Sequence, residues 1–152
     1  KADLKSHQMT VTINGAVART IPITGGKPGY ETRSGTKVII EKNAERVMDA
    51  ATTGVSADDP DYYKVTVKYA MRETWSGEFV HAAPWSVGSQ GRANVSHGCI
   101  GMSTANAQWL FNQAKVGDPI TVTGTGRALD RGNGWTDWNI SFEEFVKGSA
   151  LS

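Results

Sequence analysis

The only cysteine of the chain lies in a run of residue types that could make it a nucleophile. Cys99 ends the sequence Ser96-His97-Gly98-Cys99, and a second histidine, His81, lies upstream. The thiolate is the reactive form of cysteine, and a free thiol has a pKa of about 8.5, so a nearby base or cation must activate it. Histidine serves as that base in nucleophilic enzymes. These residues therefore predict acyl transfer by a cysteine–histidine pair.

Either histidine could be the base. His97 is two positions from Cys99, and side chains two positions apart in an extended segment share one face. His81 belongs to a different element and could approach the sulfur from across a cleft. Gly98 lets the backbone come close to a substrate, where N–H groups could stabilise a developing oxyanion. The residues alone leave the choice of base open.

Two other interpretations of the same residues compete with nucleophilic catalysis. His81, His97 and Cys99 could supply three ligands of an open zinc site, but the sequence has neither a CxxC nor an HExxH motif. A lone cysteine is also commonly a small buried apolar residue, and histidines often lie hydrogen-bonded in a core. We therefore expect no metal and no other cofactor, while the buried interpretation stays open.

The elements around these residues are mainly strands. Residues 9–13 alternate apolar and polar side chains, and Asn14-Gly15, a strong hairpin signal, follows them. Further strands are expected at residues 17–23, 37–41, 63–69 and 119–123, whereas residues 42–53 fit no single element. His81 is expected at a strand end, and residues 88–95 have the composition of a loop.

Two helices are expected after the cysteine. Ser103 can cap the first helix, whose apolar positions recur with helical spacing at Ala107, Leu110, Phe111 and Ala114. Lys115 is expected in its last turn, and Gly117 is expected to end it. Ser141 and Glu144 form a capping box for a second, short helix.

The bulk composition predicts a globular protein with no nucleic-acid partner. The 152 residues have a net charge of +1 and form no basic stripe. No apolar stretch reaches the roughly 20 residues that span a bilayer. The chain starts at Lys1 with no apolar leader, so we expect a piece of a longer protein, reaching a membrane only through an N-terminal anchor outside this chain.

The spacing of these motifs resembles a known family. His81, a spacer and Ser96-His97-Gly98-Cys99 resemble the signature of the YkuD-type L,D-transpeptidases, in which a hydrophobic residue and an Asn follow the Cys. The resemblance covers about residues 9–148 and is strongest with mycobacterial members, the L,D-transpeptidase 5 group in particular. It is carried by residues 79–87, 106–109 and 137–140 beside the motif.

The resemblance implies roles for individual residues. Cys99 would attack a tetrapeptide stem of peptidoglycan, release D-Ala and transfer the acyl group to a second stem as a 3→3 cross-link. His81 would be the base, oriented by the Ala82 carbonyl. His97 and Gly98 would shape the site, backbone N–H groups near Cys99 would form the oxyanion hole, and Ser96 would support the loop.

Four further positions are implied at the substrate. Tyr63 falls where related members carry a lid tyrosine, while Met48 and Trp85 are candidate pocket walls; ordinary packing explains all three equally well. Gly101 stands where the family motif has Asn. Because that Asn helps to hold the site together, its absence predicts a looser, slower enzyme.

The resemblance also implies the fold and the partners. It predicts a mainly β, sandwich-like YkuD catalytic domain over residues 1–128 with one helix after the cysteine. Residues 129–152 would form a C-terminal extension packed on this domain and anchored by Trp135 and Trp138. Expected partners are peptidoglycan stem peptides and carbapenems, the latter as covalent inhibitors, in the extracytoplasmic cell envelope. A peptidoglycan-binding module with a degenerate site, or a cysteine peptidase, remains the alternative; a sortase-type site would need an arginine such as Arg127.

Overall fold

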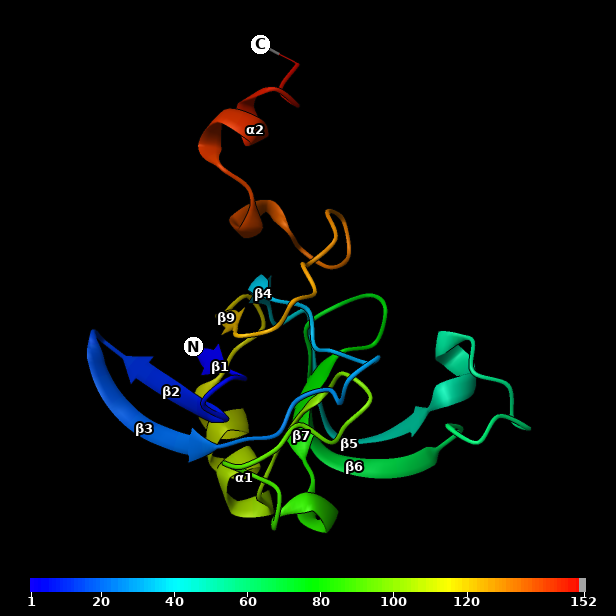
Figure 1. Cartoon of the computed structure of the whole chain (residues 1–152). Helices are drawn as coiled ribbons and strands as arrows, with labels where there is room; N and C mark the ends of the chain where they lie inside the picture. The colour runs from blue at the N-terminus through cyan, green and yellow to red at the C-terminus, as the bar shows by residue number, and fades with distance from the viewer. Residues whose placement is uncertain (151–152) are drawn as a thin grey trace.

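Two β-sheets form the body of the molecule. The structure, a computed structural model, describes residues 1–150. One sheet contains β1 (Ala2–Asp3), β2 (Gln8–Ile13), β3 (Ala16–Pro22), β4 (Gly35–Val38) and β9 (Pro119–Thr123), in the order β3-β2-β1-β9-β4. The other contains β5 (Glu41–Asp49), β6 (Lys64–Arg72), β7 (Phe79–Ala82) and β8 (Ile100–Met102), in that order. The expected mainly β fold is confirmed (Figure 1).

The hairpin and the main helix form where the sequence predicts them. Asn14 and Gly15 have φ values of 51° and 78°, the left-handed pair that a tight hairpin between β2 and β3 requires. Helix α1 (Thr104–Gln113) is capped by the Ser103 hydroxyl, which accepts a hydrogen bond from the backbone N–H of Asn106. Its buried Ala107 packs in the main core, where α1 lies against β6 and β7.

The structure corrects two boundaries. The strand expected at residues 37–41 is the junction of β4 and β5. Of the unassigned residues 42–53, the first eight continue β5 and the last four form the 3₁₀ turn η1 (Ala50–Thr53). Helix α1 ends at Gln113, so Lys115 is not in its last turn and Gly117 does not end it. Instead, the Lys42 ammonium reaches across from β5 to the carbonyl oxygens of Phe111 and Ala114. The cation that donates hydrogen bonds to the free carbonyl groups at the C-terminus of α1 therefore comes from β5 and not from the helix itself.

The C-terminal residues leave the body of the molecule, as Figure 1 shows for α2 (Phe142–Val146). The side chain of Asn139, in the 3₁₀ turn η3 (Asp137–Asn139), accepts a 2.8 Å hydrogen bond from the Thr36 N–H of β4. Trp138 is 74% exposed and Trp135 44%, so the expected tryptophan anchors are wrong. The hydrogen bond between Asn139 and Thr36 connects the extension to β4 instead. The domain boundary after residue 128 stays a prediction.

Two short 3₁₀ turns flank the site. Turn η1 (Ala50–Thr53) follows β5 and begins the connection to β6, while η2 (Pro84–Ser86) follows β7. The Ser141 half of the predicted capping box is confirmed, because the Ser141 hydroxyl accepts from the Glu144 N–H at 3.2 Å. The Glu144 carboxylate instead accepts from the Lys147 ammonium at 2.6 Å. Within residues 1–150, no helix has the length and hydropathy that crossing a membrane requires.

Candidate active site

Ser96 fixes the loop that presents the cysteine. Its backbone pairs with the segment after β3: the Ser96 N–H donates to the Gly25 carbonyl at 3.0 Å, and the Lys27 N–H donates to the Ser96 carbonyl at 2.9 Å. Its hydroxyl donates to the Cys99 carbonyl at 2.6 Å and accepts from the Gly98 N–H at 3.1 Å. Both ends of the turn are therefore tied to one side chain.

Gly98 sits in a conformation that favours glycine. Its φ is 121°, in a region that side chains with a Cβ avoid. Its carbonyl accepts a 2.8 Å hydrogen bond from the buried Thr32 hydroxyl, which in turn accepts from the Gly26 N–H at 2.9 Å. Thr32 thus anchors the loop of residues 96–99 that carries Cys99, hereafter the nucleophile loop for its candidate nucleophile, and nothing in its sequence context indicated this role.

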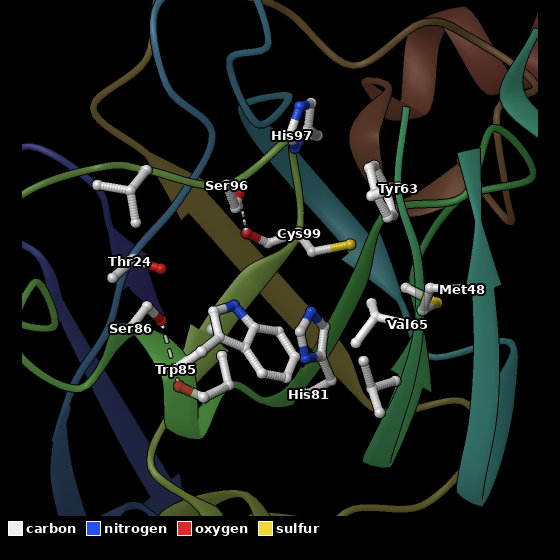
Figure 2. A pocket seen from close by; sticks show the side chains of 14 residues that line it. Thr24, Met48, Tyr63, Val65, His81, Trp85, Ser86, Ser96, His97 and Cys99 are labelled. Atoms are coloured by element: carbon white, nitrogen blue, oxygen red, sulfur yellow. Dashed lines mark hydrogen bonds between the residues drawn. The ribbon is translucent and has the colours of Figure 1, made fainter. Parts of the chain in front are cut away.

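The structure brings Cys99 and His81 to one pocket. Cys99 is 8% exposed and directly precedes β8, while His81 lies on β7, opposite Gly101 in the parallel ladder between the two strands. Figure 2 shows the imidazole ring below the thiol within the pocket. The His81 Nδ1–H donates to the Ala82 carbonyl at 2.7 Å, which leaves Nε2 as the basic nitrogen.

Burial keeps both members of this pair uncharged at rest. It raises the pKa of the Cys99 thiol to about 12, to which the nearby Glu78 and Glu73 contribute, while the Phe79 N–H opposes the shift. Burial also lowers the pKa of His81, and its hydrogen bond to the Ala82 carbonyl offsets this only in part. The site is therefore suited to a neutral thiol that loses its proton to a neutral imidazole during attack.

The expected substrate residues line this pocket, whose volume is about 380 Å³. Met48 and Tyr63 form one side with Val65 and Val67, while Trp85 covers His81 with a ring-centroid distance of 5.9 Å (Figure 2). Burial raises the pKa of the Tyr63 hydroxyl to about 12. Among the described residues, no Asp, Glu, Lys or Arg lines the pocket, which makes its wall largely apolar.

Gly101 forms the pocket floor at the point where the family motif carries a side chain. It exchanges two backbone hydrogen bonds with Thr24, of 2.9 and 3.0 Å. A Cβ built on Gly101 would lie 2.9 Å from the Ala83 Cβ and 3.1 Å from the Thr24 hydroxyl. The side chains of Ala83 and Thr24 thus crowd the place where the motif side chain would begin. The slower rate expected from its absence stays a prediction.

A buried charge cluster lies behind the nucleophile loop, and the sequence did not reveal it. Lys37 is 1% exposed, and its ammonium contacts Glu78 at 2.8 Å and Glu73 at 3.6 Å. The other oxygen of Glu78 accepts from the Arg33 N–H at 2.9 Å. Burial raises the pKa of Glu73, whose carboxyl oxygens have no hydrogen bond among the described residues. Lys37 stands in an apolar run that predicted only a strand.

The other chemical interpretations find less support in the geometry. Within residues 1–150, no group of three or more His, Cys, Asp and Glu side chains is arranged to hold a metal ion. His97 instead directs Nε2 towards Asp61 Oδ1 at 3.5 Å. Arg127, the candidate for a sortase-type site, donates to the Glu31 carbonyl at 3.4 Å and does not line the pocket.

Comparisons with known proteins point to one family. Residues 1–122 match the model of the YkuD family, described as the L,D-transpeptidase catalytic domain. L,D-transpeptidase 1 of Mycobacterium tuberculosis is 50% identical over 123 residues, which are 81% of this chain and 49% of that protein. The structure of an LD transpeptidase, LdtMt1, in complex with imipenem superimposes with a TM-score of 0.79 at 49% identity, covering 80% of this chain and 56% of the other.

The comparisons refine the resemblance within the family. L,D-transpeptidase 5 of Mycobacterium tuberculosis is 35% identical over 156 residues, which cover 99% of this chain and 33% of that protein. The expected family is thus confirmed, but L,D-transpeptidase 1 shares the higher identity, so the particular similarity to L,D-transpeptidase 5 is not favoured. The chain spans half or less of the length of either curated relative.

Proposed function

The chain belongs to the family of L,D-transpeptidase (YkuD) catalytic domains, and from this premise we propose that it cross-links peptidoglycan through a Cys99 thioester. The observation that carries the proposal is that the Cys99 thiol and the His81 imidazole line the same pocket. The hydrogen bond from His81 Nδ1 to the Ala82 carbonyl, at 2.7 Å, leaves the second nitrogen to act as a base. Three residues thereby supply nucleophile, base and orienting group.

The first half-reaction forms the thioester. His81 Nε2 takes the thiol proton as the sulfur attacks the carbonyl carbon between the third residue and the D-Ala of a tetrapeptide stem. The electron pair of the C=O bond moves to oxygen. When the tetrahedral intermediate collapses, the C–N bond breaks, and protonated His81 gives its proton to the departing amine of D-Ala. The neutral resting pair suits this sequence, because the proton moves only as the new bond forms.

The second half-reaction transfers the acyl group. An amine of a second stem enters where D-Ala left, loses a proton to His81 and attacks the thioester carbonyl. The C–S bond breaks, and the thiolate recovers its proton from His81. The product is a 3→3 cross-link. The apolar walls formed by Met48, Tyr63 and Trp85 favour transfer over hydrolysis, because they restrict the access of water to the thioester.

The oxyanion of both intermediates needs hydrogen-bond donors near Cys99. The Gly98 N–H is already occupied by the Ser96 hydroxyl at 3.1 Å. We therefore assign the backbone N–H of Cys99 as the principal donor. The 2.8 Å hydrogen bond from Thr32 to the Gly98 carbonyl fixes the peptide plane that carries this N–H. Such preorganised donors are worth about 10²–10³ in rate where they have been removed from other enzymes.

The substrate class implies where the protein works and what inhibits it. Peptidoglycan lies outside the cytoplasm, so the domain would act in the cell envelope on the stem peptides of neighbouring strands. A solved relative is described in complex with imipenem, a carbapenem. We propose that the Cys99 thiol opens the lactam ring of carbapenems in the same way that it opens the donor amide.

A cross-linking assay tests the proposed activity. The protein is incubated with a disaccharide–tetrapeptide, and a disaccharide–pentapeptide serves as the matched donor control. We expect release of D-Ala and a dimer of stems with the tetrapeptide only, and no product with Cys99→Ala. Binding of the tetrapeptide without D-Ala release would instead identify a binding module, and release of free tripeptide without a dimer would identify a peptidase.

A further inference from the structure

Asp61 connects three segments at the mouth of the pocket. It lies in the connection between η1 and β6, which also contains Asp58 and Asp59. One carboxylate oxygen accepts from the Lys27 ammonium at 2.8 Å, and the other accepts from the Tyr30 hydroxyl at 2.8 Å. The first oxygen also faces His97 Nε2 at 3.5 Å. One side chain thus ties this connection to the loop after β3 and to the nucleophile loop.

His97 is held between two aromatic rings as well as by Asp61. The ring of Tyr30 meets it edge-on, with centroids 4.8 Å apart at 71°, and the ring of Tyr63 lies tilted against it at 4.9 Å and 38°. Its Nε2 is shielded from solvent and has no hydrogen bond among the described residues, so Asp61 is the polar group that it faces. Figure 2 shows His97 and Tyr63 beside Cys99.

These contacts reach the reacting atoms through the pocket wall. Tyr63 ends the connection that carries Asp61, and both Tyr63 and His97 line the pocket that holds Cys99. If the connection moved outward, Tyr63 would leave the wall and admit water to the thiol. We propose that Asp61 is a positioning residue for acylation, holding Tyr63 and His97 in place over Cys99. This inference rests on the proposed function, because its consequence is the rate at which Cys99 is acylated.

A carboxylate is needed at this position because its two oxygens serve different partners. An asparagine would have no charge to pair with the Lys27 ammonium, and with its one acceptor oxygen on Lys27 its N–H₂ group could only reverse the hydrogen bond to the Tyr30 hydroxyl. The hydrogen bonds from Lys27 and Tyr30 lower the pKa of Asp61 to about 2. Asp61 therefore stays ionised at neutral pH, where it can accept from both Lys27 and Tyr30.

The test compares Asp61→Asn with Asp58→Asn. Both substitutions remove one negative charge from the same connection, but Asp58 is an exposed turn residue outside the contacts described above. The measurements are the second-order rate of acylation by imipenem, followed by intact mass, and the amide hydrogen exchange of residues 50–63. We expect Asp61→Asn to acylate about tenfold more slowly, since small misplacements at a reacting centre have effects of that order. Its amides in this stretch should exchange faster, while Asp58→Asn should match the wild type in both.

Thermal melting separates positioning from stability. Asp61 is 40% exposed and Lys27 36%, so their ion pair contributes little to the stability of the whole fold. The Asp61→Asn variant should therefore melt close to the wild type while its acylation slows. Tyr30→Phe, which removes one hydroxyl and leaves the ring beside His97, should give an intermediate rate.

Two outcomes would overturn the proposal. Equal acylation rates and equal exchange in Asp61→Asn and Asp58→Asn would show that Asp61 holds nothing in place. Slower acylation that accompanies a large loss of melting temperature, with no local change in exchange, would show a general structural role. If imipenem does not acylate the wild type at all, the proposed function fails, and hydrogen exchange alone still decides whether Asp61 secures the connection.

Discussion

Adding a single methyl group at Gly101 should push β8, which follows Cys99, away from the chain that follows β7 and His81. Gly101 has no left-handed φ, so alanine meets no backbone strain there. The new Cβ would instead lie 2.9 Å from the Ala83 Cβ and 3.1 Å from the Thr24 hydroxyl. Carbon atoms in contact prefer about 3.5–4.0 Å. The Ala83 Cβ is fixed to its backbone, so β8 and the chain after β7 must move apart by about 0.6 Å.

The magnitude follows from two opposing effects. Overpacking of this kind costs about 1–3 kcal/mol. Replacing glycine by alanine recovers about 0.4–1 kcal/mol, because it restricts the unfolded chain. We expect Gly101→Ala to lose about 1–2 kcal/mol of unfolding free energy, or about 2–8 °C in Tm for a chain of this size. Since His81 and Gly101 are cross-strand partners, acylation should also slow by about tenfold or more.

Urea unfolding followed by circular dichroism, together with imipenem acylation, measures both effects. Gly88→Ala is the matched control, because a Cβ there would meet nothing within 4 Å and its φ is not left-handed. That variant should be as stable as the wild type or slightly more stable. Adding Ala83→Gly to Gly101→Ala should restore part of the loss, with a coupling of about 1 kcal/mol. If Gly101→Ala unfolds and acylates like Gly88→Ala, the crowding argument is wrong.

Three further substitutions probe the base, the loop and the buried charges. Burial lowers the pKa of His81 below its value of about 6.5 in the unfolded chain. The unfolded state therefore binds more protons than the folded state, so the free energy of unfolding should fall as the pH drops below about 6.5. His81→Gln should remove that dependence in urea titrations and slow acylation about 10²–10⁴-fold; an unchanged acylation rate would exclude His81 as the base. Thr32→Val deprives the buried Gly98 carbonyl of its hydrogen-bond donor and should lower the free energy of unfolding by about 1–3 kcal/mol in the same titrations. An unchanged midpoint would show that the loop of residues 96–99 does not need this hydrogen bond. Lys37→Met removes the ammonium from Glu78, which keeps the Arg33 guanidinium at 3.3 Å, and should cost about 1.5–3 kcal/mol at pH 7. A midpoint equal to that of the wild type would contradict the pairing of Lys37 with Glu78.

Local sequence patterns predicted most of the fold. The predictions of the Asn14-Gly15 turn and the Ser103 cap are confirmed, because backbone conformation at a turn or a cap depends on the residues present there. The end of α1 was misplaced because Lys42, from a distant strand, satisfies its last carbonyls. Strand β5 was missed because its exposed positions carry no clear alternation, and its pairing with β6 is what establishes it.

The site was predicted less completely, for a related reason. Cys99 and His81 were found because their chemistry is rare and their spacing matches a family motif. Asp61, Thr32 and Lys37 act through contacts with residues far away in the chain, and each is an ordinary residue of its own turn or strand. No pattern in one sequence shows such partners. The prediction that Trp138 anchors the C-terminal extension was wrong for the same reason, because aromatic character alone does not show whether a side chain packs against another part of the chain.

The central claim is that the Cys99 thiol becomes acylated with His81 as its base, and the intact mass of the imipenem-treated protein tests it most directly. Opening of the lactam adds the whole inhibitor to the sulfur. We predict one adduct per chain, mapped to the peptide that contains Cys99. It should be absent in Cys99→Ala and should form far more slowly in His81→Gln. A folded wild-type protein that gains no mass at high imipenem concentration, or an adduct that persists in Cys99→Ala, would contradict the account.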